Sequence, residues 1–185
     1  MFGHIGLKHV LLAEKSVTFS PKEKISQFAP PTLADGAALH ALVARCPPLD
    51  PNSRYCNLLQ CSHFASTSVL AWGESGALQG AVTGYARPDC PIVLFVWQVA
   101  VAPEARGQGL GSKMLAALLA RPRRQPFHTL QTTITPSNAA SWGLFRRFAD
   151  EQGAALTALP WLNRERHFAG AQEDETLLTI EPLRT

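Results

Sequence analysis

The amino-acid sequence predicts a mixed α/β domain of the α+β kind, with helices flanking a central sheet that is mixed but mostly antiparallel. Segments that alternate apolar and polar residues interleave with segments of helical periodicity along the chain. Three consecutive strand segments between residues 66 and 103 are separated by short turns, which indicates antiparallel hairpins in the middle of the sheet. A length of 185 residues suffices for one domain with its own core.

The N-terminal part divides into an arm and the start of this domain. Residues 1–28 show no sustained periodicity, so we expect an arm there and a single domain over residues 29–185. Thr32 is placed to cap a first helix, which a Pro-Pro pair ends. A turn around residue 50 then leads into a second, shorter helix.

The rest of the chain alternates strands and helices whose ends are marked by Pro and Gly. Pro122 stops the helix after a glycine-rich segment, and Gly153 closes the last predicted helix. In order, we expect strands at 66–72, 77–88 and 92–103, a helix at 109–121, a strand at 128–135, a helix at 137–153, and strands near 154–159 and 176–181.

Composition is that of an ordinary globular protein, with 46% hydrophobic and 17% charged residues. No apolar run approaches the roughly 18 residues of a membrane-spanning helix, and the N-terminal patch lacks a signal-peptide cleavage pattern, so no membrane partner is expected. The four cysteines show no CxxC spacing. We therefore expect reduced thiols, no metal site and a cytoplasmic location.

Charge is divided unevenly along the chain. Residues 1–104 carry seven acidic and seven basic residues, residues 105–149 seven basic and no acidic ones, and residues 150–185 seven acidic and three basic ones. A basic central segment favours an anionic ligand, and an acidic C-terminal segment favours a cationic one. Alternatively, each segment can form a solvated face of the protein without a ligand. An apolar strand interrupts the basic segment, so a nucleic-acid partner is not expected.

The segment RGQGLG at residues 106–111 joins a predicted strand to a predicted helix. Amides at a helix N-terminus bind phosphate groups, and glycine lets a phosphate approach them closely. A dinucleotide-binding loop would need glycine at Ser112 and an acidic residue about twenty residues later, and both are missing. A Walker loop would need Gly-Lys-Ser/Thr, whereas the order is Gly111-Ser112-Lys113. Two interpretations of the segment remain: another kind of phosphate-binding loop, or a purely structural connection between the strand and the helix.

Two motifs mark this part of the chain, Arg106-x-x-Gly109-x-Gly111 after a strand and Asn138 at the start of the next helix. In both, the chain resembles the Gcn5-related N-acetyltransferases (GNAT), which implies the GNAT fold and acetyl-CoA as cosubstrate. By this resemblance the strand backbone binds pantetheine, the glycine loop binds the diphosphate, and Phe145 replaces a Tyr that can protonate the thiolate. The implied cofactor residues are Val99, Ala100, Val101, Arg106, Gly107, Gln108, Gly109, Leu110, Gly111, Asn138 and Phe145.

Four longer stretches are more specific: CPPLDPNSRYCNLLQCSHF, FVWQVAVAPEARGQGLG, TTITPSNAASWGLFRRFAD and the late EDETLLTI. They resemble the L-2,4-diaminobutyrate acetyltransferases of ectoine biosynthesis, over residues 32–181. The resemblance implies acetylation of the 4-amino group of L-2,4-diaminobutyrate and a homodimer. A His found in relatives is replaced here by Gln172, so the proton acceptor is water, Asp50 or a late acidic residue.

A diamino acid needs acidic groups for its ammonium groups and donors for its carboxylate. Residues 50–53 offer both on one turn, although such residues are also helix caps. Trp97 can wall the site or place its ring against an ammonium, or it can pack in the core. Glu173 belongs to an acidic cluster that can bind an ammonium or can simply be part of a solvated loop. We predict Asp50, Asn52, Ser53, Trp97 and Glu173 as substrate-binding residues, and Asp50, Trp97 and the Val99 amide as catalytic.

Two other functions stay open at this point. One is a GNAT enzyme for another small amine or amino acid, and the other is a non-catalytic acyl-CoA-binding protein.

Overall fold

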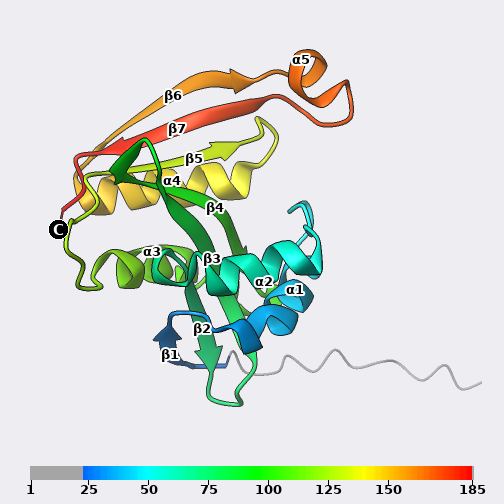
Figure 1. Cartoon of the computed structure of the whole chain (residues 1–185), viewed down its shortest axis with the longest axis vertical. Helices are drawn as coiled ribbons and strands as arrows, with labels where there is room; N and C mark the ends of the chain where they lie inside the picture. The colour runs from blue at the N-terminus through cyan, green and yellow to red at the C-terminus, as the bar shows by residue number, and fades with distance from the viewer. Residues whose placement is uncertain (1–22, 185) are drawn as a thin grey trace, which may run out of the picture.

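A computed structural model describes residues 23–184 of the chain, and Figure 1 shows a central sheet with helices packed against it. Seven strands pair in the order β1-β2-β3-β4-β5-β7-β6. All neighbouring strands are antiparallel except β4 and β5, which confirms the predicted mixed, mostly antiparallel sheet. The strands are β1 (Ile25–Ala29), β2 (Val69–Gly73), β3 (Leu78–Arg87), β4 (Cys90–Val101), β5 (Thr129–Ile134), β6 (Ala155–Leu162) and β7 (Glu175–Glu181).

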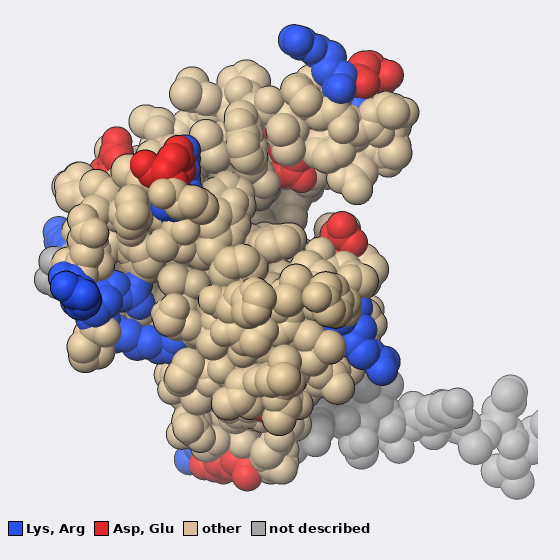
Figure 2. Space-filling view, viewed as in Figure 1, with Lys and Arg blue, Asp and Glu red and all other residues tan. Residues whose placement is uncertain are grey.

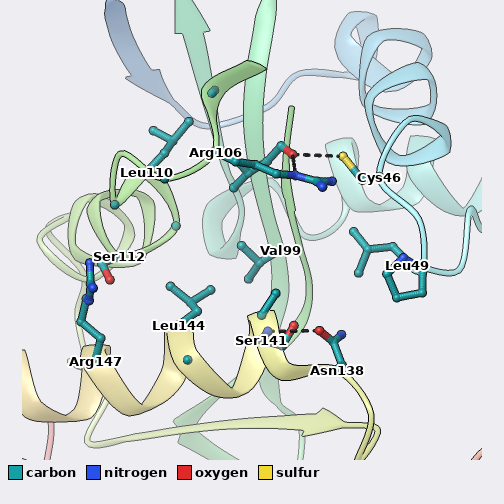
Figure 3. Close-up of a pocket in the computed structure, with 18 of the residues that line it drawn as sticks. Cys46, Leu49, Val99, Arg106, Leu110, Ser112, Asn138, Ser141, Leu144 and Arg147 are labelled. Carbon is teal, nitrogen blue, oxygen red and sulfur yellow. Dashed lines mark hydrogen bonds between the residues drawn. The ribbon is translucent and has the colours of Figure 1, made fainter. Parts of the chain in front are cut away.

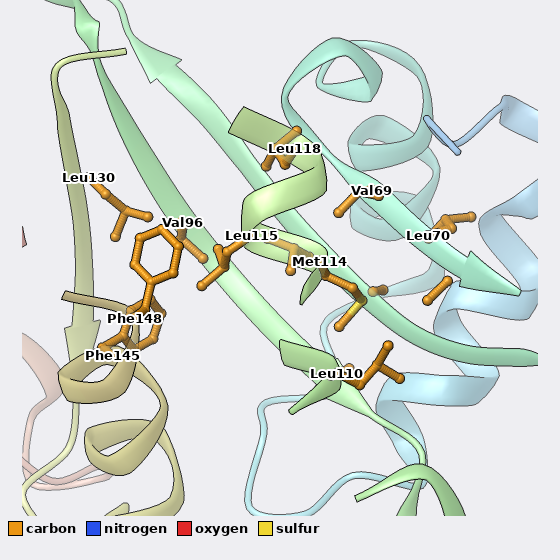
Figure 4. Close-up of a cluster of buried hydrophobic side chains, with 14 of the residues drawn as sticks. Val69, Leu70, Val96, Leu110, Met114, Leu115, Leu118, Leu130, Phe145 and Phe148 are labelled. Atoms are coloured by element: carbon orange, nitrogen blue, oxygen red, sulfur yellow. The ribbon is translucent and has the colours of Figure 1, made fainter. Parts of the chain in front are cut away.

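Five α-helices lie within the described residues. Helices α3 and α4 lie side by side on one face of the sheet, and α1 and α2 pair on the other (Figures 1 and 4). No described helix is long and apolar enough to cross a bilayer. The helices are α1 (Gly36–Ala44), α2 (Arg54–Ser62), α3 (Leu110–Leu119), α4 (Ala139–Gln152) and α5 (Arg164–Phe168), with short 3-10 turns at Leu33–Asp35, Ala65–Thr67 and Pro103–Ala105.

The apolar stripe of α3 forms the centre of the core (Figure 4). Its side chains recur at helical spacing and are almost fully buried against the sheet and against α4. Each such leucine removed from water contributes about 1.5–3 kcal/mol to folding. The residues involved are Leu110, Met114, Leu115 and Leu118 of α3, with Val96, Leu130, Phe145 and Phe148 around them.

Strands β4 and β5 pair over a short stretch only, Val93–Phe95 on the β4 side. Just beyond it, the hydroxyl of Thr132 donates a 3.0 Å hydrogen bond to the Val96 carbonyl, and the ladder between the two strands ends. Strand β4 nevertheless continues to Val101. One edge of β4 therefore lacks a strand partner, and the cavities described below lie along this edge.

Two short elements differ from the sequence prediction. Residues Ile25–Ala29, expected to belong mostly to an arm, form β1 and pair with β2. The domain therefore begins before the predicted boundary at residue 29; residues 1–22 of the predicted arm lie outside the described residues. Helix α5 was not predicted, because five residues are too few to show helical periodicity.

Candidate active site

A first cavity, of about 430 Å³, opens beside the C-terminal end of β4 (Figure 3). Its walls are the end of β4, the glycine loop that leads into α3, and α4. These are the segments that carry the two sequence motifs. Most of the predicted cofactor residues line it: Val99, Val101, Arg106, Gly107, Gly109, Leu110, Gly111 and Asn138.

The glycine loop has a backbone that only glycine adopts readily. Gly107 and Gly109 have φ values of 74° and 69°, in the left-handed region. Gly109 is also the N-cap of α3, and it supplies no side chain to the amides of the first helical turn. Those amides have no carbonyl partner within the helix, and the helix dipole makes this end positive. The loop is therefore an anion-binding site of the kind that holds phosphate groups.

Gly111, which lines the first cavity, also has a packing role that was not predicted. A Cβ at this position would lie 2.8 Å from Cδ1 of Leu144 on α4. Gly111 therefore permits the close contact between α3 and α4, whereas the approach of a phosphate depends on the left-handed residues Gly107 and Gly109.

Ser112 and Arg147 also line the first cavity; Ser112 was not predicted as a binding residue, and Arg147 was included only as part of the basic segment. Ser112 is only 6% exposed, and its hydroxyl has no hydrogen-bond partner among the described residues. Burying an unsatisfied hydroxyl costs about 1–3 kcal/mol, so this group points to a ligand. Arg147 projects from α4 towards Ser112 in Figure 3. It shares a helix face with Leu144 and Ala140, a periodicity that makes it recognisable from sequence.

Hydrogen bonds at the end of β4 define which backbone groups face the cavity. The Val101 carbonyl accepts bonds from Nε of Arg106 at 3.2 Å and from Sγ of Cys46 at 3.3 Å, so it points away from β3. Peptide groups alternate in direction along a strand. The backbone of Val99 therefore faces the same unpaired edge, while that of Ala100 faces β3.

A second cavity, of about 620 Å³, lies on the other side of Val99. The turn before α2, the end of β5, α5 and the loop before β7 surround it. Figure 2 shows the molecule hollowed between the α5 region and the loop before α2, with acidic side chains on both sides. The acidic residues that line the cavity are Asp50, Glu173 and Glu175.

A β-bulge directs Trp97 into this second cavity. Val96 pairs with Gly84 and Gln98 with Thr83, which leaves Trp97 as an extra residue on β4. The indole remains 43% exposed and lines the cavity. Of the two predicted roles, the structure therefore supports the wall and excludes a buried core position.

The turn at Asp50 is held by its own hydrogen bonds and by β4. Oδ1 of Asp50 accepts from the Asn52 amide at 3.0 Å, and the Asp50 carbonyl accepts from Nε2 of Gln98 at 2.7 Å. Asp50 and Asn52 both line the second cavity. Ser53 does not: its hydroxyl accepts from the Cys56 amide at 3.0 Å and caps α2. Ser53, rather than Asp50 or Asn52, is thus the helix cap.

The acidic cluster at residues 173–175 divides into different roles. Oε1 of Glu173 accepts a 2.8 Å hydrogen bond from the Ser137 hydroxyl at the edge of the second cavity. Asp174 points elsewhere, since it accepts from the Arg164 amide and from Nδ2 of Asn163 at the start of α5. Successive residues of an extended chain alternate in direction, so Glu175 returns to the side of Glu173.

Glu175 is the residue of this cluster that was not predicted individually. Its Oε2 is buried without a hydrogen-bond partner among the described residues. Burial raises its pKa and is the largest effect; a hydrogen bond with Thr133 lowers the pKa by less, and the nearby charge of Glu173 adds a smaller rise. A carboxylate held in this way favours the arrival of a cation.

The two cavities share part of their lining: Pro48, Leu49, Val99, Asn138 and Ser141. Asn138 caps α4, with its Oδ1 accepting from the Ser141 amide at 3.1 Å, and this leaves its Nδ2 to donate to a ligand. A molecule in the first cavity and a molecule in the second can therefore meet beside the Val99 backbone.

Three predicted cofactor residues lie outside the first cavity. Ala100 is 1% exposed, in the core. Gln108 lines a separate hollow next to β1. Phe145 is 3% exposed and contributes to the second cavity instead. A phenyl ring at this place cannot donate a proton to a leaving group.

Comparisons with known proteins agree with this geometry. The chain matches the acetyltransferase (GNAT) family over residues 37–149. It is 49% identical over 154 residues to the L-2,4-diaminobutyric acid acetyltransferase of Methylotuvimicrobium alcaliphilum, covering 83% of this chain and 89% of that protein. It is 41% identical over 155 residues to the enzyme of the same name from Halomonas elongata, covering 84% and 80% of the two chains.

Solved structures give the same result. The diaminobutyrate acetyltransferase EctA from Paenibacillus lautus, in complex with its substrate L-2,4-diaminobutyric acid and coenzyme A, superposes with a TM-score of 0.81. That protein is 33% identical, and the alignment covers 88% of this chain and 98% of the other. A phosphinothricin acetyltransferase from Sinorhizobium meliloti, 20% identical with a TM-score of 0.64, shares the fold. The chain belongs to the GNAT family and, within it, to the L-2,4-diaminobutyric acid acetyltransferases.

Proposed function

We propose that the chain transfers the acetyl group of acetyl-CoA to the 4-amino group of L-2,4-diaminobutyrate, a step of ectoine biosynthesis that gives 4-N-acetyl-L-2,4-diaminobutyrate. The observation that carries the proposal is the meeting of two cavities at Val99, one with an anion-binding loop and one lined by carboxylates. The Paenibacillus lautus relative, whose complex holds both L-2,4-diaminobutyric acid and coenzyme A, supports it.

Acetyl-CoA occupies the first cavity in this proposal. Its diphosphate lies at the N-terminus of α3, where the amides from Arg106 to Gly111 converge, and Ser112 and Arg147 add a hydroxyl and a cation. The pantetheine arm extends along the unpaired edge of β4 at Val99, in the manner of an added strand. Gln108 contributes through the loop backbone, because its side chain lies in another hollow.

The amine occupies the second cavity. Asp50 and Glu173 flank it from opposite sides, and the ring of Trp97 forms a wall against which an ammonium can lie. Asn52 supplies amide groups from the same turn as Asp50. Ser53 acts through the helix that it caps, and we assign it no contact with the substrate.

The reaction is a direct transfer. The ammonium loses a proton, the amine nitrogen forms a bond to the acetyl carbonyl carbon, and the C–S bond then breaks as the nitrogen loses a second proton and CoA leaves as its thiolate. The Val99 amide, which faces the unpaired edge, stabilises the developing oxyanion. Two reactants held next to each other also gain effective molarity. No side chain of the protein needs to be acylated, so the four thiols take no part.

Two carboxylates of the second cavity, Asp50 and Glu175, can accept the ammonium proton, directly or through water. Glu175 is better suited, because its raised pKa brings it closer to the working pH of a general base. Phe145 holds the position from which a family Tyr protonates the thiolate, so the thiolate takes its proton from solvent.

Thiol release measured with acetyl-CoA and a panel of amines tests the proposal. We expect turnover with L-2,4-diaminobutyrate and much slower turnover with lysine, whose two ammonium groups are farther apart. Turnover restricted to lysine or spermidine would assign the chain to another small-amine acetyltransferase, and CoA binding without turnover of any amine would identify a non-catalytic acyl-CoA-binding protein.

We also propose a cytoplasmic homodimer. On β6, Leu159 and Trp161 are 64% and 49% exposed, and the Trp161 ring lies 6.2 Å from that of Phe95. Exposed apolar side chains of this kind favour burial against a second copy. The four cysteines are all free thiols, which suits a reducing compartment. Light scattering should give a mass near twice 20.1 kDa, whereas a mass of 20.1 kDa would contradict the dimer.

A further inference from the structure

The charges that line the second cavity are all of one sign. Asp50, Glu173 and Glu175 contribute three carboxylates. Within residues 23–184, no Lys, Arg or His side chain is part of this lining. The remaining polar groups there are neutral, namely hydroxyls and amides such as those of Ser137, Thr133 and Gln98.

The three carboxylates are held in place before any amine arrives. The Asp50 carboxylate accepts from the Asn52 amide at 3.0 Å, and the Glu173 carboxylate from the Ser137 hydroxyl at 2.8 Å. Glu175 has a hydrogen bond with Thr133, and its Oε2 is buried without a partner among the described residues. Mutual repulsion among these groups is relieved by positive charge in the cavity, and two positive charges relieve it more than one.

L-2,4-diaminobutyrate carries two ammonium groups and one carboxylate, and the lining treats them unequally. Both ammonium groups meet carboxylates, which form strong charge-assisted hydrogen bonds. The substrate carboxylate meets only neutral donors and the repulsion of three like charges. Most of the favourable recognition energy therefore comes from the pair of ammonium groups and their spacing.

We propose that the chain also acetylates diamines that lack the carboxylate, with 1,3-diaminopropane as the matching acceptor. This inference rests on the proposed function, because it concerns the same site. Removal of the carboxylate from L-2,4-diaminobutyrate leaves 1,3-diaminopropane, with the same spacing between the two nitrogens. Removal of the 2-amino group instead gives 4-aminobutyrate, a zwitterion that keeps the carboxylate and loses one of the two recognised positive charges.

The chemistry of the step is unchanged. One ammonium of the diamine loses two of its three protons as the N–C bond to the acetyl group forms and the C–S bond breaks; one of these protons ends on the CoA sulfur. The products are N-acetyl-1,3-diaminopropane, CoA as its thiol and one proton. No further reactant is needed.

A three-substrate comparison tests the inference on the full-length protein, with thiol release from acetyl-CoA as the readout. We expect kcat/KM for 1,3-diaminopropane within about tenfold of that for L-2,4-diaminobutyrate, and kcat/KM for 4-aminobutyrate at least about a hundredfold lower. A hundredfold loss with 1,3-diaminopropane alongside an active L-2,4-diaminobutyrate reaction would overturn the inference and leave the proposed function intact. Activity on 1,3-diaminopropane without activity on L-2,4-diaminobutyrate would overturn the proposed function and support diamine acetylation.

A matched pair of variants tests the electrostatic reason. Glu173→Gln removes one carboxylate from the cavity, and Glu165→Gln removes one from the neighbouring α5, where Glu165 pairs with Arg164 outside the cavity. We expect Glu173→Gln to lower the ratio of kcat/KM for 1,3-diaminopropane to that for L-2,4-diaminobutyrate by about fivefold, and Glu165→Gln to leave the ratio unchanged. An equal ratio in both variants would show that carboxylate charge does not select the diamine.

Discussion

The indole ring of Trp97 lies edge-on to the phenol ring of Tyr85, with ring centroids 6.4 Å apart and an interplanar angle of 81°. Phe64 contacts both rings, at 6.5 Å from Trp97 and 5.8 Å from Tyr85. Trp97 is also the bulged residue of β4. The bulge turns this side chain to the second cavity, and the aromatic contacts hold it there beside the acidic residues.

The bulge requires Gly84 opposite it. A Cβ at Gly84 would lie 2.6 Å from the backbone carbonyl oxygen of Phe95, so Gly84→Ala should lower the free energy of unfolding by about 1–3 kcal/mol. Gly143→Ala is the control for stability, because a Cβ there faces the first cavity and meets nothing within 4 Å. It should raise the free energy of unfolding by about 0.5–1 kcal/mol. Urea denaturation measures the free energy of unfolding of both variants. Equal stability of the two variants would contradict the claim that the bulge requires glycine at position 84.

Two adjacent arginines of α4 should differ in their effect on the cofactor. Arg147 lines the first cavity, whereas the Arg146 guanidinium lies 5.2 Å from the centroid of the Trp142 ring and outside it. Arg147→Ala should raise KM for acetyl-CoA by about tenfold with little change in kcat, because it removes binding of a phosphate group. Arg146→Ala should leave KM within about twofold. Steady-state kinetics with varied acetyl-CoA distinguishes the two variants. A larger increase in KM for Arg146→Ala than for Arg147→Ala would show that Arg147 does not bind the phosphate group.

Neighbouring residues of the turn before α2 should separate stability from substrate binding. Ser53→Ala removes the cap of α2 and should lower the free energy of unfolding by about 1 kcal/mol with KM for L-2,4-diaminobutyrate unchanged. Asp50→Asn should instead raise that KM by about tenfold, because one carboxylate facing the ammonium groups is lost. A raised KM in Ser53→Ala at unchanged stability would restore the substrate contact that the sequence suggested.

Replacement of Glu175 by a neutral residue should make the protein more stable at neutral pH. Burial raises the folded-state pKa of Glu175, so the folded protein binds a proton more tightly than the unfolded chain does. This group therefore lowers stability as pH rises from the ordinary carboxyl pKa through the raised one. Glu175→Gln should have a higher Tm than the unaltered protein at pH 7, with the difference shrinking towards pH 4. A lower Tm at pH 7 would show that the ionised side chain is stabilised in the fold.

Sequence alone predicts the elements with a long, regular pattern. The apolar alternation of β4 and the stripe of α3 are repeated often enough to be recognised, and Gly153 marks the end of α4 in the structure as expected. Strand β1 could not be recognised in this way. Three of its five residues are exposed, and its position depends on pairing with β2, some forty residues later in the chain.

The candidate site was also predicted only in part, because sequence patterns show local requirements and not contacts between distant segments. The glycine loop is recognisable because its residues are contiguous and their backbone requirement is local. Glu175 and Arg147 reach the site through folding of distant segments, and only the alternation of a strand and the periodicity of a helix hint at their directions. The role of Gly111 depends on Leu144 of another helix, so no local pattern contains it.

The central claim is that the two cavities bring acetyl-CoA and the 4-amino group of L-2,4-diaminobutyrate together at Val99. NMR of the product formed from acetyl-CoA and L-2,4-diaminobutyrate tests this claim most directly. We predict a single product in which the methylene protons next to the 4-nitrogen move downfield and the 2-proton does not. A product acetylated on the 2-nitrogen, or no product while CoA binds, would contradict it.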